Sequence, residues 1–277
     1  MIRTARPGDR PELEAVYNAC FPGEEDFCHW FFGRVYCPES TLVWDEHGIA
    51  AAVQLLPVRL TLKGQEVPCT YIYAAGTLPQ HRGRGLMGAL LERSFVLSAA
   101  RGDRLSVLIT QEPSLVDYYA RFGYRPVFAR QEHRAPAAEL PADTALFPMT
   151  DRDIAAAQRL YETEQQGLHA LRDAVAWRLI LEQYGKNAVV FRRGGQITAF
   201  ALAESGKDCL TATEALGPDA PILMAALAGR RGVQSACWYG PVTSEAKVNG
   251  CARPLDEEGE ALLKKLHGCG YLNVLFN

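Results

Sequence analysis

The chain has 277 residues, enough for about two domains, and its 48% hydrophobic content can furnish a sizeable core for each. A net charge of −3 gives no basis for a nucleic-acid partner. The N-terminus is polar and no apolar run approaches the roughly 20 residues that span a bilayer, so neither a signal peptide nor a membrane partner is expected. These features predict a cytoplasmic protein.

The cysteines are scattered and none lies in a CxxC pair. That spacing indicates neither a zinc site nor a disulfide framework, so reduced thiols and no bound metal are expected. The eight positions are Cys20, Cys28, Cys37, Cys69, Cys209, Cys237, Cys251 and Cys269.

The first 77 residues are predicted to form a strand, two helices and an antiparallel meander. Apolar residues at helical spacing indicate the helices, and alternating apolar residues bounded by turn residues indicate the strands that follow. A helix, a glycine stop and a further strand follow. The predicted elements are strands at 2–5, 40–44 and 48–62, a strand that ends near Thr77, helices at 9–20, 24–32 and 86–100, and a strand at 105–110.

The stretch 133–143, HRAPAAELPAD, neither alternates nor forms a clean amphipathic helix, so it is predicted to be a linker. A second domain is expected to begin near Ala145. Its start echoes that of the first, since FPMTDRDIAAAQRLYETEQ and IRTARPGDRPELEAVYNAC both place Asp before a helix with a tyrosine near its end, Tyr161 or Tyr17. Strands predicted at 188–191, 197–203 and 209–215 repeat the order of strands predicted in the first half.

Between the meander and the helix at 86–100, residues 79–91 read PQHRGRGLMGALL. Glycines let the backbone approach a ligand, and a helix start supplies N–H groups and positive potential for an anion. Arg82 and Arg84 add fixed charge. This turn is therefore predicted to bind a phosphate.

Three types of phosphate loop compete for these residues. A P-loop is excluded, because Gly83 and Gly88 have the wrong spacing and no lysine or hydroxyl residue follows. Gly83, Gly85 and Gly88 spell GxGxxG, which leaves dinucleotide binding open, although 77–82 intervene before the first glycine. Gln80, Gly83 and Gly85 form the third pattern, QxxGxG.

That third pattern closely resembles the acetyl-CoA pyrophosphate loop of the GNAT acetyltransferase superfamily. A second motif supports the resemblance, because EPSLVDYYARFGYRPV is similar to the family's helix that ends in Tyr, three residues, Gly and an aromatic. Tyr119, Gly123 and Tyr124 hold those places. Two motifs at the family's separation imply a GNAT fold, an α/β (α+β) architecture with a mixed central sheet flanked by helices.

Where a second phosphate loop would recur, the chain reads LGPDAPILMAAL, with no QxxGxG, no arginine and Asp219 in an anion's place. The resemblance thus implies tandem GNAT-like domains at 1–135 and 145–277, the second degenerate and unable to bind CoA. This arrangement is similar to the enhanced-intracellular-survival type of acetyltransferase, which acetylates amines. Those enzymes add a sterol-carrier-like third domain and use their terminal carboxylate, whereas this chain ends in YLNVLFN.

The resemblance implies direct transfer of acetyl from acetyl-CoA to a primary amine of a small molecule or peptide. Tyr119 would protonate the departing thiolate, and a possible homo-oligomer is left open. The residues expected to bind the cofactor are Ala75, Gly76, Thr77, Gln80, Arg82, Gly83, Arg84, Gly85, Leu86, Met87, Gly88, Ser114 and Leu115.

No general base stands out, because Tyr71 and Tyr73 occupy the positions of the family's strand glutamate. Candidate bases are Glu66, Glu112, His133 and the Asn277 carboxylate, and a water chain could also serve. The segment 21–32, FPGEEDFCHWFF, combines acidic and aromatic residues that suit a cation, or forms an amphipathic helix with an acidic start. A non-catalytic acyl-CoA-binding module and an NAD-dependent oxidoreductase remain as alternatives.

Overall fold

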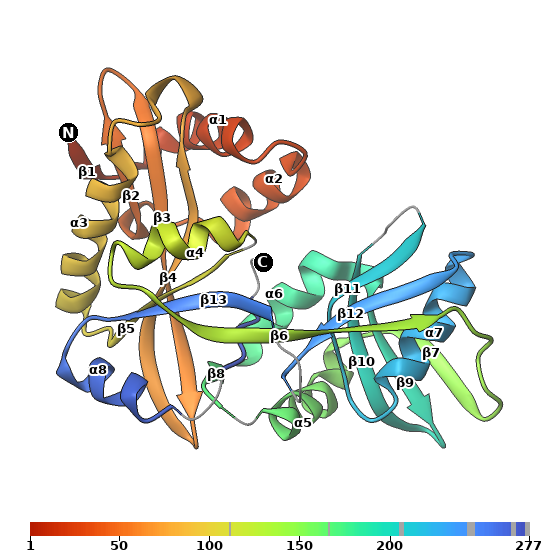
Figure 1. Ribbon diagram of the computed structural model, residues 1–277. Helices are drawn as coiled ribbons and strands as arrows, with labels where there is room; N and C mark the ends of the chain where they lie inside the picture. The colour runs from red at the N-terminus through yellow and green to blue at the C-terminus, as the bar shows by residue number, and fades with distance from the viewer. Residues whose placement is uncertain (111, 166, 205–207, 243–246, 267–269, 275–277) are drawn as a thin grey trace. The chain divides into compact units, whose positions relative to one another are not determined.

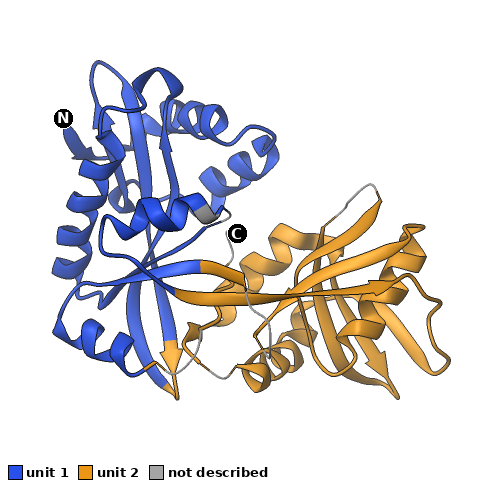
Figure 2. Cartoon of the chain, viewed as in Figure 1, with its two compact units in different colours: residues 1–60, 65–126, 250–265 blue, residues 61–64, 127–249, 266–277 orange. Residues whose placement is uncertain are grey.

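The computed structural model describes residues 1–110, 112–165, 167–204, 208–242, 247–266 and 270–274. The chain forms two compact units (Figure 2). Unit 1 comprises Met1–Leu60, Gln65–Pro126 and Gly250–Lys265, and unit 2 comprises Thr61–Gly64, Val127–Asn249 and Leu266–Asn277. The domain limits of 1–135 and 145–277 stay a prediction.

Unit 1 is built on a mixed sheet with strand order β1-β2-β3-β4-β5-β13 (Figure 1). Each strand and helix predicted within residues 1–110 is confirmed, with ends that differ by one or two residues. The elements are β1 Ile2–Thr4, η1 Pro7–Asp9, α1 Arg10–Cys20, α2 Glu25–Arg34, η2 Pro38–Ser40, β2 Thr41–Asp45, β3 Ile49–Leu62, β4 Gln65–Thr77, η3 Pro79–His81, α3 Leu86–Arg101, β5 Leu105–Ile109, α4 Pro113–Ala120, β13 Lys247–Pro254 and α8 Glu257–Lys264.

Helices cover both faces of this sheet. On one face, α3 buries Leu90 and Phe95 in a cluster with residues of β2, β3, β4, β5 and β13. On the other face, α1 and α2 meet β4, where the Tyr73 ring lies 5.1 Å from that of Phe31. The apolar spacing of α3 and its left-handed glycine stop at Gly102 are the features that predicted the helix.

Strands β4 and β5 pair over a short distance only. The parallel register joins Cys69 to Leu105 and ends at Tyr71 and Val107, although β4 continues to Thr77. Beyond that point Ala74 adopts a positive φ of 47°, which is uncommon outside glycine and interrupts the regular alternation of the strand. The last third of β4 therefore has an edge that β5 does not use.

A C-terminal segment completes unit 1. Residues 250–254 of β13 pair antiparallel with all five residues of β5. Helix α8 then packs so closely that a Cβ on Gly259 would lie 2.2 Å from the Arg104 carbonyl oxygen. Arg104 also forms ion pairs with Asp256 and Glu258. Unit 1 thus depends on residues far along the chain from its first 126.

Unit 2 contains a sheet with strand order β6-β12-β11-β10-β9-β7. The strands predicted at 188–191, 197–203 and 209–215 are confirmed as β9, β10 and β11. Its elements are β6 Arg125–Pro136, β7 Thr144–Pro148, η4 Asp151–Asp153, α5 Ile154–Glu164, β8 His169–Ala170, α6 Ala174–Tyr184, η5 Gly185–Asn187, β9 Ala188–Arg193, β10 Gln196–Glu204, β11 Cys209–Leu216, α7 Ala220–Arg231 and β12 Ser235–Gly240.

The linker predicted at 133–143 is wrong for its first four residues. His133 and Pro136 belong to β6, which pairs antiparallel with β12 from Gln131 to Pro136. Backbone pairing with a strand about a hundred residues later makes this segment regular, whereas its side chains show no strand alternation.

The predicted α/β class is confirmed, since mixed sheet and flanking helices make up the structure (Figure 1). From β1 to β5 and from β7 to β12 the chain repeats one order of strand, 3₁₀ turn, two helices, 3₁₀ turn, three strands, helix and strand, interrupted by η3 and by β8. Among the described residues, none of the helices combines the length and hydropathy needed to cross a bilayer.

The close contact at Gly259 gives a stability prediction. We expect Gly259→Ala to lower the free energy of unfolding by about 1–3 kcal/mol, because the new methyl group would force α8 away from the Arg104 carbonyl. The matched control is Gly33→Ala in α2, where no atom lies within 4 Å of an added Cβ. That change should stabilise by up to about 1 kcal/mol through helix propensity.

Urea unfolding of both variants measures the difference. Equal midpoints for the two variants would mean that α8 does not pack on β5 as described.

Candidate functional site

The glycine-rich loop leads directly into α3. Gly83 and Gly85 adopt positive φ values of 76° and 77°, a region that favours glycine, and Gly85 is the N-cap of the helix. Leu86 and Met87 form the first turn, which carries no acidic residue. A helix start of this kind presents backbone N–H groups and positive potential to an anion.

The two loop arginines are held by neighbouring groups of the chain. Arg82 donates from Nε to the Thr77 carbonyl at 3.1 Å. Arg84 donates to both carboxylate oxygens of Glu46 at 2.8 and 3.1 Å and contacts Nδ1 of His81 at 2.9 Å. Gln80 lies in η3. Glu46 thus fixes Arg84 beside the loop, a partner that the sequence did not indicate.

Ala75, Gly76 and Thr77 lie in the part of β4 that extends past its pairing with β5. A Cβ on Gly76 would lie 3.0 Å from Sγ of Cys20, so α1 approaches the strand as closely as a glycine permits. The strand edge that faces away from β3 can offer backbone N–H and C=O groups to an extended amide-bearing ligand.

Tyr119 lies near the end of α4 and packs in an aromatic group. Its ring centroid lies 5.2 Å from that of Tyr118 and 5.6 Å from that of Tyr124. Burial raises the pKa of Tyr119 to about 12, with smaller contributions from Tyr118 and Cys251. Tyr119 therefore keeps its proton at neutral pH and can act as a proton donor.

Neighbouring residues hold this aromatic group in place. The Tyr124 hydroxyl lies 2.6 Å from that of Ser106 on β5. A Cβ on Gly88 would lie 3.1 Å from Cζ of Phe122, so Gly88 allows the α4 end to pack on α3. Ser114 and Leu115 lie in the first turn of α4 and are exposed.

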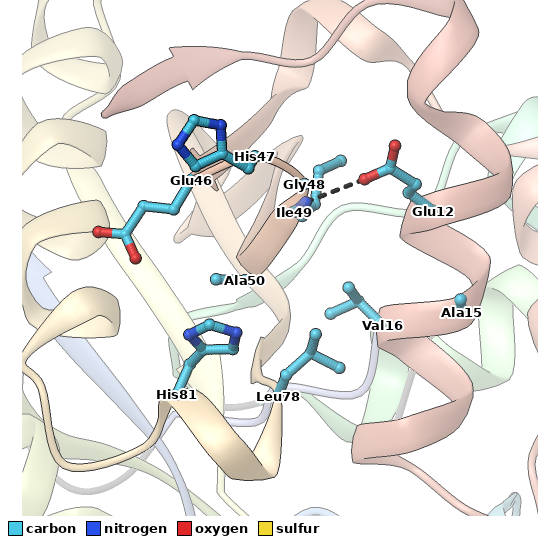
Figure 3. A pocket seen from close by; sticks show the side chains of 10 residues that line it. All are labelled: Glu12, Ala15, Val16, Glu46, His47, Gly48, Ile49, Ala50, Leu78 and His81. Carbon is cyan, nitrogen blue, oxygen red and sulfur yellow. Dashed lines mark hydrogen bonds between the residues drawn. The ribbon is translucent and has the colours of Figure 1, made fainter.

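A pocket of about 280 Å³ adjoins the loop on the side of α1 (Figure 3). Glu12, Glu46 and His81 line it, and Glu12 accepts a hydrogen bond from the Ile49 N–H at 2.9 Å. Both carboxylates are thus already bound by groups of the chain. This pocket was not predicted from the sequence, because its wall joins α1 to the β2–β3 turn, which are far apart in the chain.

The candidate general bases differ in their surroundings. Glu66 pairs with Arg59 on the surface, and Glu112 is the exposed N-cap of α4. His133 belongs to unit 2, where its ring stacks on Trp238 and burial lowers its pKa. Asn277 lies outside the described residues.

In unit 2 the turn between β11 and α7 corresponds in element order to the loop before α3. Here the Gly217 N–H donates to Glu164, and the pKa of Glu164 is raised by burial. Asp219, the N-cap of α7, accepts two hydrogen bonds from Arg193 at 3.0 Å and one from Thr198 at 2.7 Å. Carboxylates of the chain itself therefore occupy this turn.

Comparisons with known proteins agree with this geometry. Residues 1–127 match the family profile described as an acetyltransferase (GNAT) domain. An uncharacterized N-acetyltransferase of Streptomyces avermitilis is 32% identical over 89 residues, which are 32% of this chain and 21% of that protein. This chain therefore aligns with only about a fifth of that relative.

Two solved structures are similar to nearly the whole chain. A GCN5-related N-acetyltransferase from Anabaena variabilis has a TM-score of 0.68 and 17% identity, covering 92% of this chain and 73% of that one. Eis1 from Mycobacterium abscessus has a TM-score of 0.62 and 18% identity, covering 92% and 74%. The fold is therefore shared with both proteins.

Residues 1–127 thus resemble a GNAT acetyltransferase domain, which agrees with the predicted acyltransferase class of enzyme. Acyl-CoA is the cofactor class of such domains.

The raised pKa of the partly buried Tyr119 predicts a loss of stability at alkaline pH. Its folded pKa of about 12 exceeds the ordinary value of about 10, so its contribution is complete below about pH 10 and is lost as pH rises towards 12. At about 1.4 kcal/mol per pKa unit, the contribution is at most roughly 3 kcal/mol.

Urea unfolding of the wild type and of Tyr119→Phe at several pH values measures this effect. We expect a shallower pH dependence for the variant. Parallel curves would show that the Tyr119 hydroxyl is not buried as described.

Proposed function

We propose that the protein is an N-acetyltransferase that moves acetyl directly from acetyl-CoA to a primary amine of a small molecule or peptide. The observation that carries the proposal is the divergence of β4 from β5 beside a glycine loop that begins α3. An extended cofactor needs both a strand edge for its amides and an anion site for its pyrophosphate. Unit 1 offers the two next to each other in the chain.

In this proposal the backbone does most of the binding. N–H groups from Gly83 to Gly88 hold the pyrophosphate, while residues 75–77 pair with the pantetheine amides. One of those amides also stabilises the oxyanion that forms when the amine attacks the thioester, an effect commonly worth a few kcal/mol.

Tyr119 supplies the proton for the leaving thiolate. Because its pKa is raised, Tyr119 is protonated before the reaction begins. The burial that raises this pKa also disfavours a thiolate anion held beside Tyr119. Both groups are therefore destabilised as anions, so a proton can pass from the phenol as the C–S bond breaks.

We further propose that unit 2 is a degenerate second copy of the same fold. The repeated element order supports this, and Glu164 and Asp219 occupy the turn that would otherwise face a phosphate. Its role would be to shape the acceptor's surroundings. A cytoplasmic location without nucleic-acid or membrane partners completes the proposal.

Calorimetry with acetyl-CoA and with NADH is the first experiment, followed by thiol-release assays with spermidine, kanamycin and a lysine peptide. Acetyl-CoA binding with thiol release supports the proposal. Acetyl-CoA binding without release from any amine favours a non-catalytic acyl-CoA-binding module. Binding of NADH alone would overturn the assignment in favour of an oxidoreductase.

Tyr119→Phe should lower kcat by about 10²-fold or more, because general acid catalysis is lost while the ring remains. Acetyl-CoA affinity, measured by calorimetry, should stay within about twofold. An unchanged kcat would remove Tyr119 from the mechanism.

Gly85→Glu should abolish acetyl-CoA binding, because it places bulk and negative charge at a left-handed N-cap where the pyrophosphate is expected. The matched control is Gly8→Glu, which adds the same charge in open space in η1. Calorimetry with acetyl-CoA on both variants measures the two affinities. Equal affinities would place the pyrophosphate elsewhere.

A further inference from the structure

Two tyrosine hydroxyls meet on the α1 side of β4. The Tyr17 and Tyr73 hydroxyl oxygens lie 3.0 Å apart, and either can be the donor. Tyr73 follows Tyr71, the last β4 residue paired with β5, and precedes the 75–77 stretch assigned to the cofactor. The pair therefore borders the part of the strand where the acetyl group is expected.

Both hydroxyls stay protonated at neutral pH. Burial raises the pKa of Tyr17 to about 12 and raises that of Tyr73 further. A neutral phenol carries one donor and two acceptor positions. Two hydroxyls in contact can pass a proton along: one accepts a proton while the other donates its own, and neither hydroxyl stays ionised.

Charged and titratable groups of α2 and β4 act on the pair. The charge of Glu24, the N-cap of α2, contributes to raising the pKa of both hydroxyls, while Cys28 of α2 acts on Tyr17 and Tyr71 of β4 acts on Tyr73. Glu24 is exposed, so its carboxylate can exchange protons with water. The charge of this exposed carboxylate therefore acts on both hydroxyls.

A proton path is needed at this place, because β4 carries no carboxylate from Val67 to Thr77, and Glu66 at its start pairs with Arg59 on the surface. An alkyl amine with a pKa near 10.4 is neutral in only about one molecule per thousand at pH 7. The amine must therefore lose a proton close to the thioester.

We propose that the Tyr17–Tyr73 hydroxyl pair conducts the amine proton from the reacting nitrogen to Glu24. This inference rests on the proposed acetyl transfer. The bound ammonium first gives up one proton through Tyr73 and Tyr17 to Glu24, which releases it to water. As the neutral amine attacks, the C–N bond forms and the C–S bond breaks; its second proton passes to Tyr73, that of Tyr73 to Tyr17, and that of Tyr17 to Glu24. Tyr119 protonates the thiolate, and exchange with water returns a proton from Glu24 to Tyr119.

The test compares wild type, Tyr73→Phe, Tyr17→Phe and the double variant with the panel amine that gives the highest thiol release. Tyr36→Phe is the matched control, since its ring packs 5.0 Å from Phe32 and its buried hydroxyl has no hydrogen-bond partner among the described residues. The measurements are kcat, the pH profile of kcat/KM and acetyl-CoA affinity by calorimetry.

We expect each single variant to lower kcat about 10- to 100-fold, with acetyl-CoA affinity within about twofold. The kcat of the double variant should be no lower than that of either single variant, because the loss of one hydroxyl already interrupts the proton path. For Tyr73→Phe, kcat/KM should keep rising towards the pKa of the free amine, because only solvent then removes the proton. Tyr36→Phe should match the wild type.

A Tyr73→Phe enzyme with unchanged kcat and an unchanged pH profile would overturn the inference, whatever its stability. Additive losses in the double variant would overturn it too, since they indicate two independent packing defects. A wild type that binds acetyl-CoA yet releases no thiol with any amine would instead refute the proposed function, and the inference with it.

Discussion

The early end of the β4–β5 ladder is the constraint on which the site depends. Two adjacent parallel strands normally satisfy each other's backbone groups along their common length, yet here only three residue pairs are joined. Beyond Tyr71 the β4 edge can pair with a ligand, and the chain turns within a few residues into the loop that begins α3. One divergence thus places an unpaired strand edge next to a helix start.

Strand β5 remains fixed while β4 departs from it. All five residues of β5 pair with β13, and α8 packs on the carbonyl just before the strand. Ser106 on β5 also contacts Tyr124, which packs against Tyr119. The proposed proton donor is therefore positioned through a strand that the C-terminal segment supports, although the family match ends at residue 127.

The sequence predicted those features that local chemistry specifies. Gly83 and Gly85 are needed for left-handed backbone, and the spacing of Leu90 and Phe95 marks α3. It did not predict contacts between distant segments, such as the pairing of β6 with β12 or the Tyr17–Tyr73 contact. Hydrophobic pattern and residue propensity are local properties, so they do not identify a partner far away in the chain. The cofactor-binding residues assigned from the motif stay a prediction.

The two helix-start turns use the same physics with opposite results. A helix N-terminus attracts negative charge whether that charge belongs to a ligand or to the chain. In unit 2 Glu164 takes the Gly217 N–H, while Arg193 and Thr198 hold Asp219. In unit 1 Glu46 is bound instead to Arg84, and no side chain caps α3 among the described residues. A phosphate approaching unit 2 would have to displace a hydrogen-bonded, partly buried carboxylate, whereas in unit 1 the first turn of α3 has no such competitor.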